Sequence, residues 1–357
     1  MSVHRTATIA MLMISFGLSL FGQAHSFNCP ASSSSSVNLW VSQSRLSSTH
    51  RRFPTHIDLY RKFHDYGWSK LIDTHDEINI GVPDDLLCNS SPVKGSPGTS
   101  VVAELRSTSR FQFLDSSKSV LRLARSAFLE TQTAEEVPLI TPMTIHVLNF
   151  VLFPDPDIQI LTNESKEIEG HVGLPIFGAD VVSLPGNKHL VALDFQPVLT
   201  MDRGANLLPE RYSHFESKLK AIHSRYQQSN NGMAPCLPWG GDIPSQAERF
   251  FSPYALWSRL TDDNAIDIVN TSVWSAFQEY FDLYLELMIA VQTDVSLQKT
   301  PTSATDMIGQ TNPARSGQID YLEYRRQNDP ARPMLRRLYG ESWTERVIAE
   351  VLFPDFL

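Results

Sequence analysis

The sequence predicts one α+β domain built on a mostly antiparallel β-sheet. Strand-like segments are grouped in the middle of the chain, with helical patterns before and after them. Hydrophobic residues make up 42% of the 357 residues and charged residues 19%, which is typical of a globular protein with a substantial core. No internal repeat and no Gly/Ser-rich linker follows residue 100. A single domain over residues 58–357 is therefore expected.

The first half of this domain is predicted to be one helix followed by strands. Residues 58–78 carry apolar residues at helical spacing and predict the helix. The stretch 88–100 is rich in Pro, Gly and Ser and predicts a loop. Three strand-like runs follow, the last of them uniformly apolar and ending at a proline: VVAELRS, SVLRLARSAFLE and TIHVLNFVLF.

The second half is predicted to be a hairpin followed by helices. An acidic, polar stretch between Phe153 and Leu174 predicts an exposed excursion, and VVSL and HLVALDF flank a Pro-Gly-Asn turn. Residues 207–228 predict a helix, ended by SNNGMAP. The pattern from Ser272 is apolar on nearly every face and predicts a buried helix. A last helix is expected to start at Asp329-Pro330.

The N-terminal 57 residues have the composition of a targeting leader. They contain no Asp or Glu. Residues 1–26 have an early Arg, then an apolar run, and small residues at the end, where a signal peptidase would cut, so they predict a signal peptide. The alternative is a membrane anchor, but Ser and Gly interrupt the apolar run. Residues 27–57 are rich in Ser and Arg, as in a transit peptide; the alternative is a disordered linker. In tandem they resemble the bipartite leaders of secondary-plastid algae, which implies the plastid stroma and a mature protein outside the membrane.

The charge balance of the predicted mature domain disfavours nucleic acid as a partner. The whole chain has a net charge of −9. Removing the four basic residues of the leader leaves 26 Lys and Arg against 39 Asp and Glu, a net charge of about −13. Strong negative charge opposes binding to phosphate backbones.

Familiar cofactor and metal motifs are absent from the sequence. There is no GxGxxG, no GxxxxGK[ST], no HExxH and no GxSxG. The three cysteines are widely spaced, and the histidines lack metal-ligand spacing. His146, in a strand-like run, is expected to be a core histidine. The side chains of such an enzyme would act directly on the substrate, or on a substrate that serves as its own chromophore or electron sink.

Two carboxylates stand out, although local pattern alone does not make either a site. Asp180 follows Gly178 within an apolar segment, and its simpler interpretation is a polar residue that closes a turn. Asp329 precedes Pro330, a common helix start, so an N-cap is the simpler interpretation there. An apolar pocket would let such carboxyl groups hold a proton near neutral pH.

Six segments, in chain order, resemble the ferredoxin-dependent bilin reductases. The resemblance covers roughly residues 58–357, and the last segment is the most specific. It implies a three-layer α/β/α sandwich, in which a central antiparallel sheet is flanked by helices. The segments are VLNFVLFP, PIFGADVVSLPG, HLVALDFQP, WGGDIP, FFSPYALWSR and YRRQNDPARPMLRRLYGESWTERVIAEVLF.

The resemblance also implies roles for individual residues. Asp180 and Asp329 match the acids that donate protons from the sheet side and the helix side of the bilin. Arg325 matches a position that assists the substrate or its propionates, the alternative being a solvated arginine. Asn149, Asp194 and Gln196 are implied to bind substrate. Members that make phycocyanobilin carry a histidine at the position of Asn149, and an amide cannot replace it as a proton donor.

The implied reaction is a ferredoxin-dependent, two-electron reduction of the A-ring diene of 15,16-dihydrobiliverdin to phycoerythrobilin through a bilin radical. No metal or organic cofactor is implied. The partners are the open-chain tetrapyrrole, ferredoxin and, as a further candidate, a bilin lyase or an upstream bilin reductase; a monomer is expected. Three alternatives stay open: the same reduction on biliverdin, formation of 15,16-dihydrobiliverdin, and a bilin carrier without turnover. An arginine patch near the bilin opening, Arg325, Arg326, Arg332, Arg336 and Arg337, is expected to attract acidic ferredoxin.

Overall fold

The sheet and its helices are described by a computed structural model of the chain. The predicted leader and the exact start of the mature domain lie outside the residues it describes, and none of the helices within those residues has the length and apolar character needed to span a membrane. The described residues are 59–74, 81–94, 98–108, 119–133, 145–161, 168–171, 173–184, 188–199, 206–227, 236–261, 263–297 and 312–355.

Seven strands form one antiparallel sheet in the order β1-β2-β3-β4-β7-β8-β9. This confirms the predicted class and the predicted hairpin, which is the pair β7–β8. Their bounds are β1 Cys88–Pro92, β2 Thr99–Thr108, β3 Leu121–Thr133, β4 His146–Pro154, β7 Ile176–Leu184, β8 Lys188–Gln196 and β9 Leu256–Leu260.

The loop predicted over residues 88–100 is wrong, because β1 and the start of β2 lie within it. Strand β1 is an edge strand of sequence CNSSP that pairs only with β2. An edge strand with polar side chains lacks the apolar alternation on which strand prediction depends, and proline is tolerated there. Its backbone pairing therefore decides its structure, and the side-chain pattern does not.

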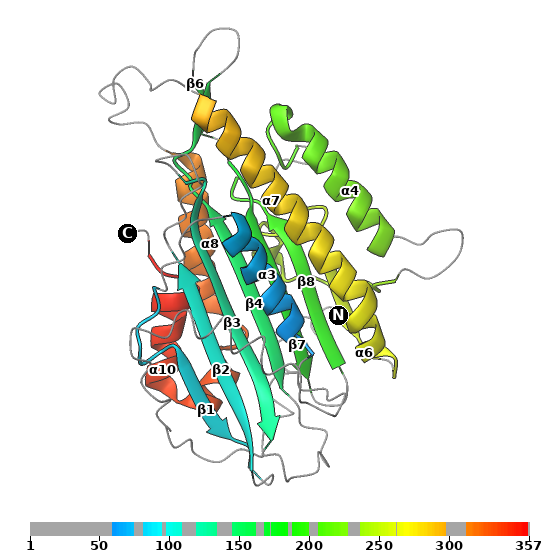
Figure 1. Cartoon of the computed structure of the whole chain (residues 1–357), viewed down its shortest axis with the longest axis vertical. Coiled ribbons are helices and arrows are strands. Elements are labelled where there is room, and N and C mark those ends of the chain that lie inside the picture. The colour runs from blue at the N-terminus through cyan, green and yellow to red at the C-terminus, as the bar shows by residue number, and fades with distance from the viewer. Residues whose placement is uncertain are drawn as a thin grey trace, which may run out of the picture.

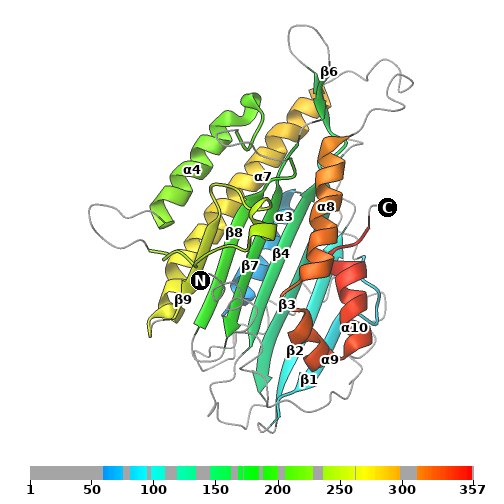
Figure 2. The ribbon, with the colours of Figure 1, turned by 180° about the vertical axis from the view of Figure 1, so that it is seen from behind.

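Helices cover both faces of the sheet, which confirms the three-layer arrangement. Figure 1 shows α3, α4 and α7 in front of the sheet, and Figure 2, the view from behind, shows α8, α9 and α10 over the opposite face. The bounds are α3 Arg61–Thr74, α4 Ser213–Gln227, α5 Ser245–Glu248, α6 Ala265–Ile268, α7 Trp274–Leu297, α8 Pro313–Asn328, α9 Arg332–Tyr339 and α10 Glu341–Arg346, with single-turn elements η3 Glu210–Tyr212, η4 Val269–Val273 and η5 Val347–Leu352.

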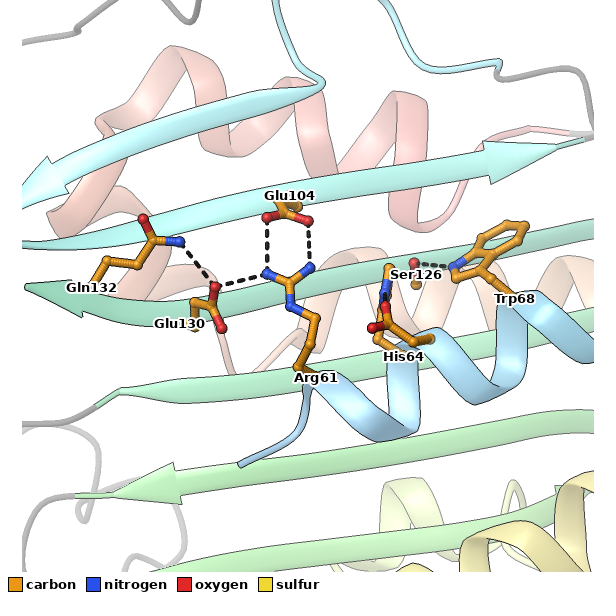
Figure 3. A network of polar contacts seen from close by, with 8 residues as sticks. Arg61, His64, Trp68, Glu104, Ser126, Glu130 and Gln132 are labelled. Carbon is orange, nitrogen blue, oxygen red and sulfur yellow. Dashed lines mark hydrogen bonds and ion pairs between the residues drawn. The ribbon is translucent and has the colours of Figure 1, made fainter. Parts of the chain in front are cut away.

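Helix α3, the first predicted helix, is fixed to β2 and β3 by polar contacts (Figure 3). Arg61 donates to Glu104 at 2.7 Å and to Glu130 at 2.8 Å. About two turns further along the helix, Trp68 Nε1 donates to the Ser126 hydroxyl at 2.8 Å. These contacts set the position of the helix along the strands, while the apolar core supplies the general attraction.

Helix α7 lies on the sheet beside α3 and α4, and most of its apolar side chains are buried, as the sequence predicts, although Ile289 is 45% exposed. Its tyrosines are satisfied by main-chain carbonyls, since Tyr280 donates to Tyr254 O at 2.6 Å and Tyr284 to Pro175 O at 3.0 Å. Buried hydroxyl groups without such partners would cost stability. This packing leaves the opposite face of the sheet to the C-terminal helices.

The single last helix expected from Asp329 to Phe353 is divided in the structure. Helix α9 ends at Gly340, which has φ +87° and starts α10 in a new direction. Glycine tolerates this left-handed conformation, which other residues adopt at a cost. Helix α8, just before Asp329, was not predicted, because its sequence PARSGQIDYLEYRRQN has few apolar residues to show a helical period.

The excursion predicted between Phe153 and Leu174 contains a small two-stranded sheet, β5 Gln159–Leu161 and β6 Ile168–His171. Its base is tied to the start of α8, where Asp157 pairs with Arg315 and accepts from Asn312 Nδ2 at 2.7 Å. At 1.5 Å per residue, the helix carries the chain about 20 Å from Asn312 to Arg325. The base of the excursion therefore lies at one end of α8 and Arg325 near the other.

Candidate functional site

The candidate site lies on the face of the sheet covered by α8, α9 and η5. Asp180 of β7 is the direct cross-strand partner of Asn149 of β4, so both side chains leave the same face. Their neighbours Phe177, Ala179 and Val181 alternate to the other face and join the core beneath α7. The Asp180 side chain keeps one-third of its surface exposed.

Arg325, in the last turn of α8, joins both predicted acids. Its Nη1 lies 3.6 Å from Asp180 Oδ2, and its Nη2 lies 3.8 Å from Asp329 Oδ2. The guanidinium is mostly buried and also lies 3.4 Å from the Tyr321 hydroxyl, one turn back on the same helix. One carboxylate comes from the sheet and one from the helix side, and a single cation holds them together.

Asp329 has both of the roles that the sequence left open. Its Oδ1 accepts the N–H of Ala331 at 2.8 Å, as a capping residue does, and its Oδ2 is the oxygen that faces Arg325. Its side chain is almost fully buried. Burial raises the pKa of this carboxyl, and the charge of Arg325 opposes the rise. The group therefore keeps a proton to a higher pH than an exposed aspartate would.

Asn149 has the partners that a polar residue needs in so apolar a strand. Its Nδ2 donates to Asp180 Oδ1, and its Oδ1 accepts from Nη1 of Arg125 in β3. The sheet side of the site is therefore a hydrogen-bonded row from Arg125 through Asn149 to Asp180. Such a row fixes the orientation of each member.

This arrangement brings two potential proton donors to one arginine. It has one acid on the sheet, a second acid on the helix side and a cation between them. Among the described residues, no group of three or more His, Cys, Asp or Glu side chains could hold a metal ion.

Comparison with known proteins assigns the family. The family model described as "Ferredoxin-dependent bilin reductase" matches residues 141–354. The chain belongs to the ferredoxin-dependent bilin reductases. This confirms the resemblance noted in the sequence, and the protein is a ferredoxin-dependent oxidoreductase.

Curated relatives of this reductase are named phycoerythrobilin:ferredoxin oxidoreductase. One from Nostoc punctiforme is 31% identical over 298 residues, covering 83% of this chain and 93% of the relative. One from Prochlorococcus marinus MIT 9211 is 37% identical over 234 residues, covering 65% and 72%. Tomato phytochromobilin synthase, solved in complex with biliverdin, has the same fold at a TM-score of 0.53 and 22% identity, covering 82% of each chain.

Sequence reasoning missed Arg125, Tyr321 and Phe353 in the reductase site. The centroid of the Phe353 ring lies 4.7 Å from the guanidinium carbon of Arg125 and 5.0 Å from that of Arg325. Both cations therefore contact the same aromatic ring. A signal for Arg125 was present, because it is spaced at two-residue intervals with Ala127 and Leu129 and so shares their core-facing side of the strand. An arginine at such a position requires partners.

Asp194 and Gln196 of β8 leave the same face as Asp180, but Asp194 is occupied by another contact. Its two oxygens accept the hydroxyl and the N–H of Ser252 at 2.5 and 2.9 Å, and it is 1% exposed. Gln196 packs over Gly178, where a Cβ would lie 2.9 Å from its amide. Asp194 therefore anchors the segment that leads into β9, and substrate binding by either residue stays a prediction.

Asp194 is expected to make the stability of the reductase depend on pH. Burial raises its pKa from 3.8 to about 7. An acid with a higher pKa in the folded than in the unfolded state stabilises the fold fully below the unfolded value, and this stability is lost as the pH rises from about 4 to about 7. The free energy of unfolding should fall by roughly 2–3 kcal/mol between pH 5 and pH 8 in the wild type. Denaturant unfolding of Asp194→Asn should lack this component; an unchanged slope would contradict the assignment.

His146 lies on the far side of the sheet from Asp180. Its ring is 6.1 Å from the ring of Tyr60, whose hydroxyl lies 2.6 Å from His189 Nδ1. All three residues are buried beneath the α3 layer. The interpretation of His146 as a core residue is therefore confirmed.

The arginines expected to form a patch for ferredoxin are largely paired within the reductase. Arg325 is turned into the site and cannot belong to an exposed patch. Three of the others pair with carboxylates at the C-terminal end, which lowers the positive field that they present: Arg326 with Asp355, Arg332 with Glu345, and Arg336 with Glu341 and Glu345. The prediction of an exposed patch is therefore wrong for Arg325, and pairing with carboxylates reduces the positive charge that Arg326, Arg332 and Arg336 present to a partner.

Proposed function

We propose that this reductase adds two electrons and two protons across the A-ring diene of 15,16-dihydrobiliverdin, giving phycoerythrobilin. The observation that carries the proposal is the pair of acids, one from the sheet and one from the helix side, held by Arg325. The names of the curated relatives support the product. Asn149 at the centre of the site supports a two-electron reaction, because an amide supplies no proton at neutral pH.

Two reduced ferredoxins supply the electrons, one at a time, and each is oxidised in turn. The bilin holds the first electron as a radical, and no metal or organic cofactor takes part. Asp180 and Asp329 each give one proton to the reducing bilin and regain it from solvent. Burial raises the pKa of the Asp329 carboxyl above that of an exposed aspartate, which suits it to this task.

The location proposed for the enzyme is the plastid stroma, reached with residues 1–57 as the leader. The absence of acidic residues from this stretch is the feature that supports it. A fusion of residues 1–57 to a fluorescent protein should be imported and shortened by the plastid. Retention of the full-length fusion outside the plastid would contradict the location.

An anaerobic assay tests the reaction. Ferredoxin with a reducing system is supplied with either 15,16-dihydrobiliverdin or biliverdin, and products are identified by chromatography. Phycoerythrobilin from 15,16-dihydrobiliverdin is the expected result. If the formation of phytochromobilin from biliverdin is the faster reaction, biliverdin is the substrate in place of 15,16-dihydrobiliverdin. If the protein binds pigment without any turnover, it is a bilin carrier.

A further inference from the structure

Arg125 is a buried cation with spare hydrogen-bond donors next to the proposed proton donor. It is 0% exposed, and its Nη1 donates a hydrogen bond to Asn149 Oδ1. Within the part of the chain that the structure describes, its Nε and Nη2 have no hydrogen-bond partner. A buried guanidinium with few partners lowers stability. Its pKa is lowered to about 10 by burial, so it is still charged at neutral pH.

The strand register allows this contact. Arg125 pairs across the strands with Val151, and Ala127, two residues on, pairs with Asn149. All four side chains leave the same face. Because Ala127 has only a methyl group, the arginine can extend beside it to reach the amide of Asn149.

Arg125 determines which end of that amide meets Asp180. A guanidinium has only donors, so the atom of Asn149 that faces it must be the carbonyl oxygen. The amide nitrogen is then directed at Asp180 Oδ1. With Oδ1 engaged as an acceptor, Oδ2 is the oxygen that can carry a proton, and Oδ2 is the one that faces Arg325 and the helix side.

We propose that Arg125 is a positioning residue of the reductase, which acts through Asn149 to keep the transferable proton of Asp180 on Oδ2. This inference rests on the proposed function for its catalytic meaning. The geometry itself can be tested without substrate. Other charged or titratable groups that face the cluster come from α8 and the turn after it: Tyr321, Arg325 and Asp329.

The test replaces Arg125 with methionine, which keeps an unbranched side chain and removes charge and donors. In substrate-free protein with ¹³C-labelled aspartate carboxyls, the Asp180 signal is assigned from Asp180→Asn and followed against pH. Without Arg125 the amide can turn and stop donating to the carboxylate. The midpoint of the signal should move to higher pH, because the charged carboxylate loses a hydrogen bond that favours it.

Asn149→Ala tests the route through the amide. It should move the same midpoint in the same direction, and Arg125→Met should add little in that background. Full additivity would mean that Arg125 acts by its charge alone and would overturn the proposal. Arg106→Met is the matched control, because Arg106 is a mostly buried arginine of β2 with a pKa also lowered to about 10, on the α3 face of the sheet. It should leave the midpoint unchanged.

Turnover separates this inference from the proposed function. Arg125→Met should slow bilin reduction about tenfold and move the alkaline limb of its pH profile in the same direction as the carboxyl signal. A wild type that never turns over bilin would refute the proposed function and leave the carboxyl measurement intact. A carboxyl signal unaffected by Arg125→Met, in an active wild type, would refute the positioning role alone.

Discussion

Replacement of either Asp180 or Asp329 by asparagine is expected to slow bilin reduction by a factor of about 10² to 10⁴, the usual contribution of a positioned proton donor. Pigment binding should persist, because asparagine keeps the size and polarity of each side chain. In Asp329→Asn, the amide oxygen can still accept the N–H of Ala331, so the turn after α8 should survive. Spectra of the bound pigment and single-turnover rates with reduced ferredoxin measure the two effects separately.

The pH profile distinguishes the helix-side acid from a passive neighbour. Burial raises the pKa of Asp329, so its protonated form should support turnover until the pH passes this raised value, and the rate should then fall. Asp329→Asn should remove that alkaline limb. Asp320→Asn is a control on the same helix, since Asp320 is exposed and pairs with Arg249 at 3.4 Å. A loss of rate in the control as large as in Asp329→Asn would contradict a specific role for Asp329.

The sequence predicted the sheet because its central strands have local signals. The apolar run of β4 and the alternation of β7 and β8 depend on a period that neighbouring residues show. Asp180 and Asp329 were singled out by the family resemblance, because the local pattern favoured a turn residue at Asp180 and a helix cap at Asp329. Only the fold shows that one arginine lies between them.

Features that depend on distant contacts could not be predicted in this way. Asp194 was predicted to bind substrate because its segment resembles the family, but its hydrogen-bond partner Ser252 is 58 residues away in the chain. The Arg125–Asn149 hydrogen bond likewise joins two strands whose register the sequence does not state. Helix α8 lacked a clear period because much of its surface is polar, yet it supplies Arg325.

Gly317 is expected to be the position in α8 where the smallest substitution has the largest effect on stability. A Cβ placed there would lie 1.6 Å from the carbonyl oxygen of Val198 and 2.7 Å from its carbonyl carbon. Neither backbone atom can rotate away, so Gly317→Ala should force α8 off the chain that follows β8. We expect the free energy of unfolding to fall by at least about 3 kcal/mol, measured by denaturant titration.

The sign of the change in stability is a decisive test of how α8 packs against the backbone at Val198. Glycine to alanine within a helix normally stabilises by about 1 kcal/mol, so a variant as stable as the wild type, or more stable, would show that the close backbone contact does not exist. Gly81→Ala is the control, because the atom nearest to a Cβ placed at Gly81 would be Ser107 O, at 4.0 Å. Arg325 lies two turns after Gly317, and its 3.6 Å contact with Asp180 depends on the same seating. Folded Gly317→Ala protein should therefore also lose bilin reduction, because the helix-side acid and its cation would be displaced together from the sheet.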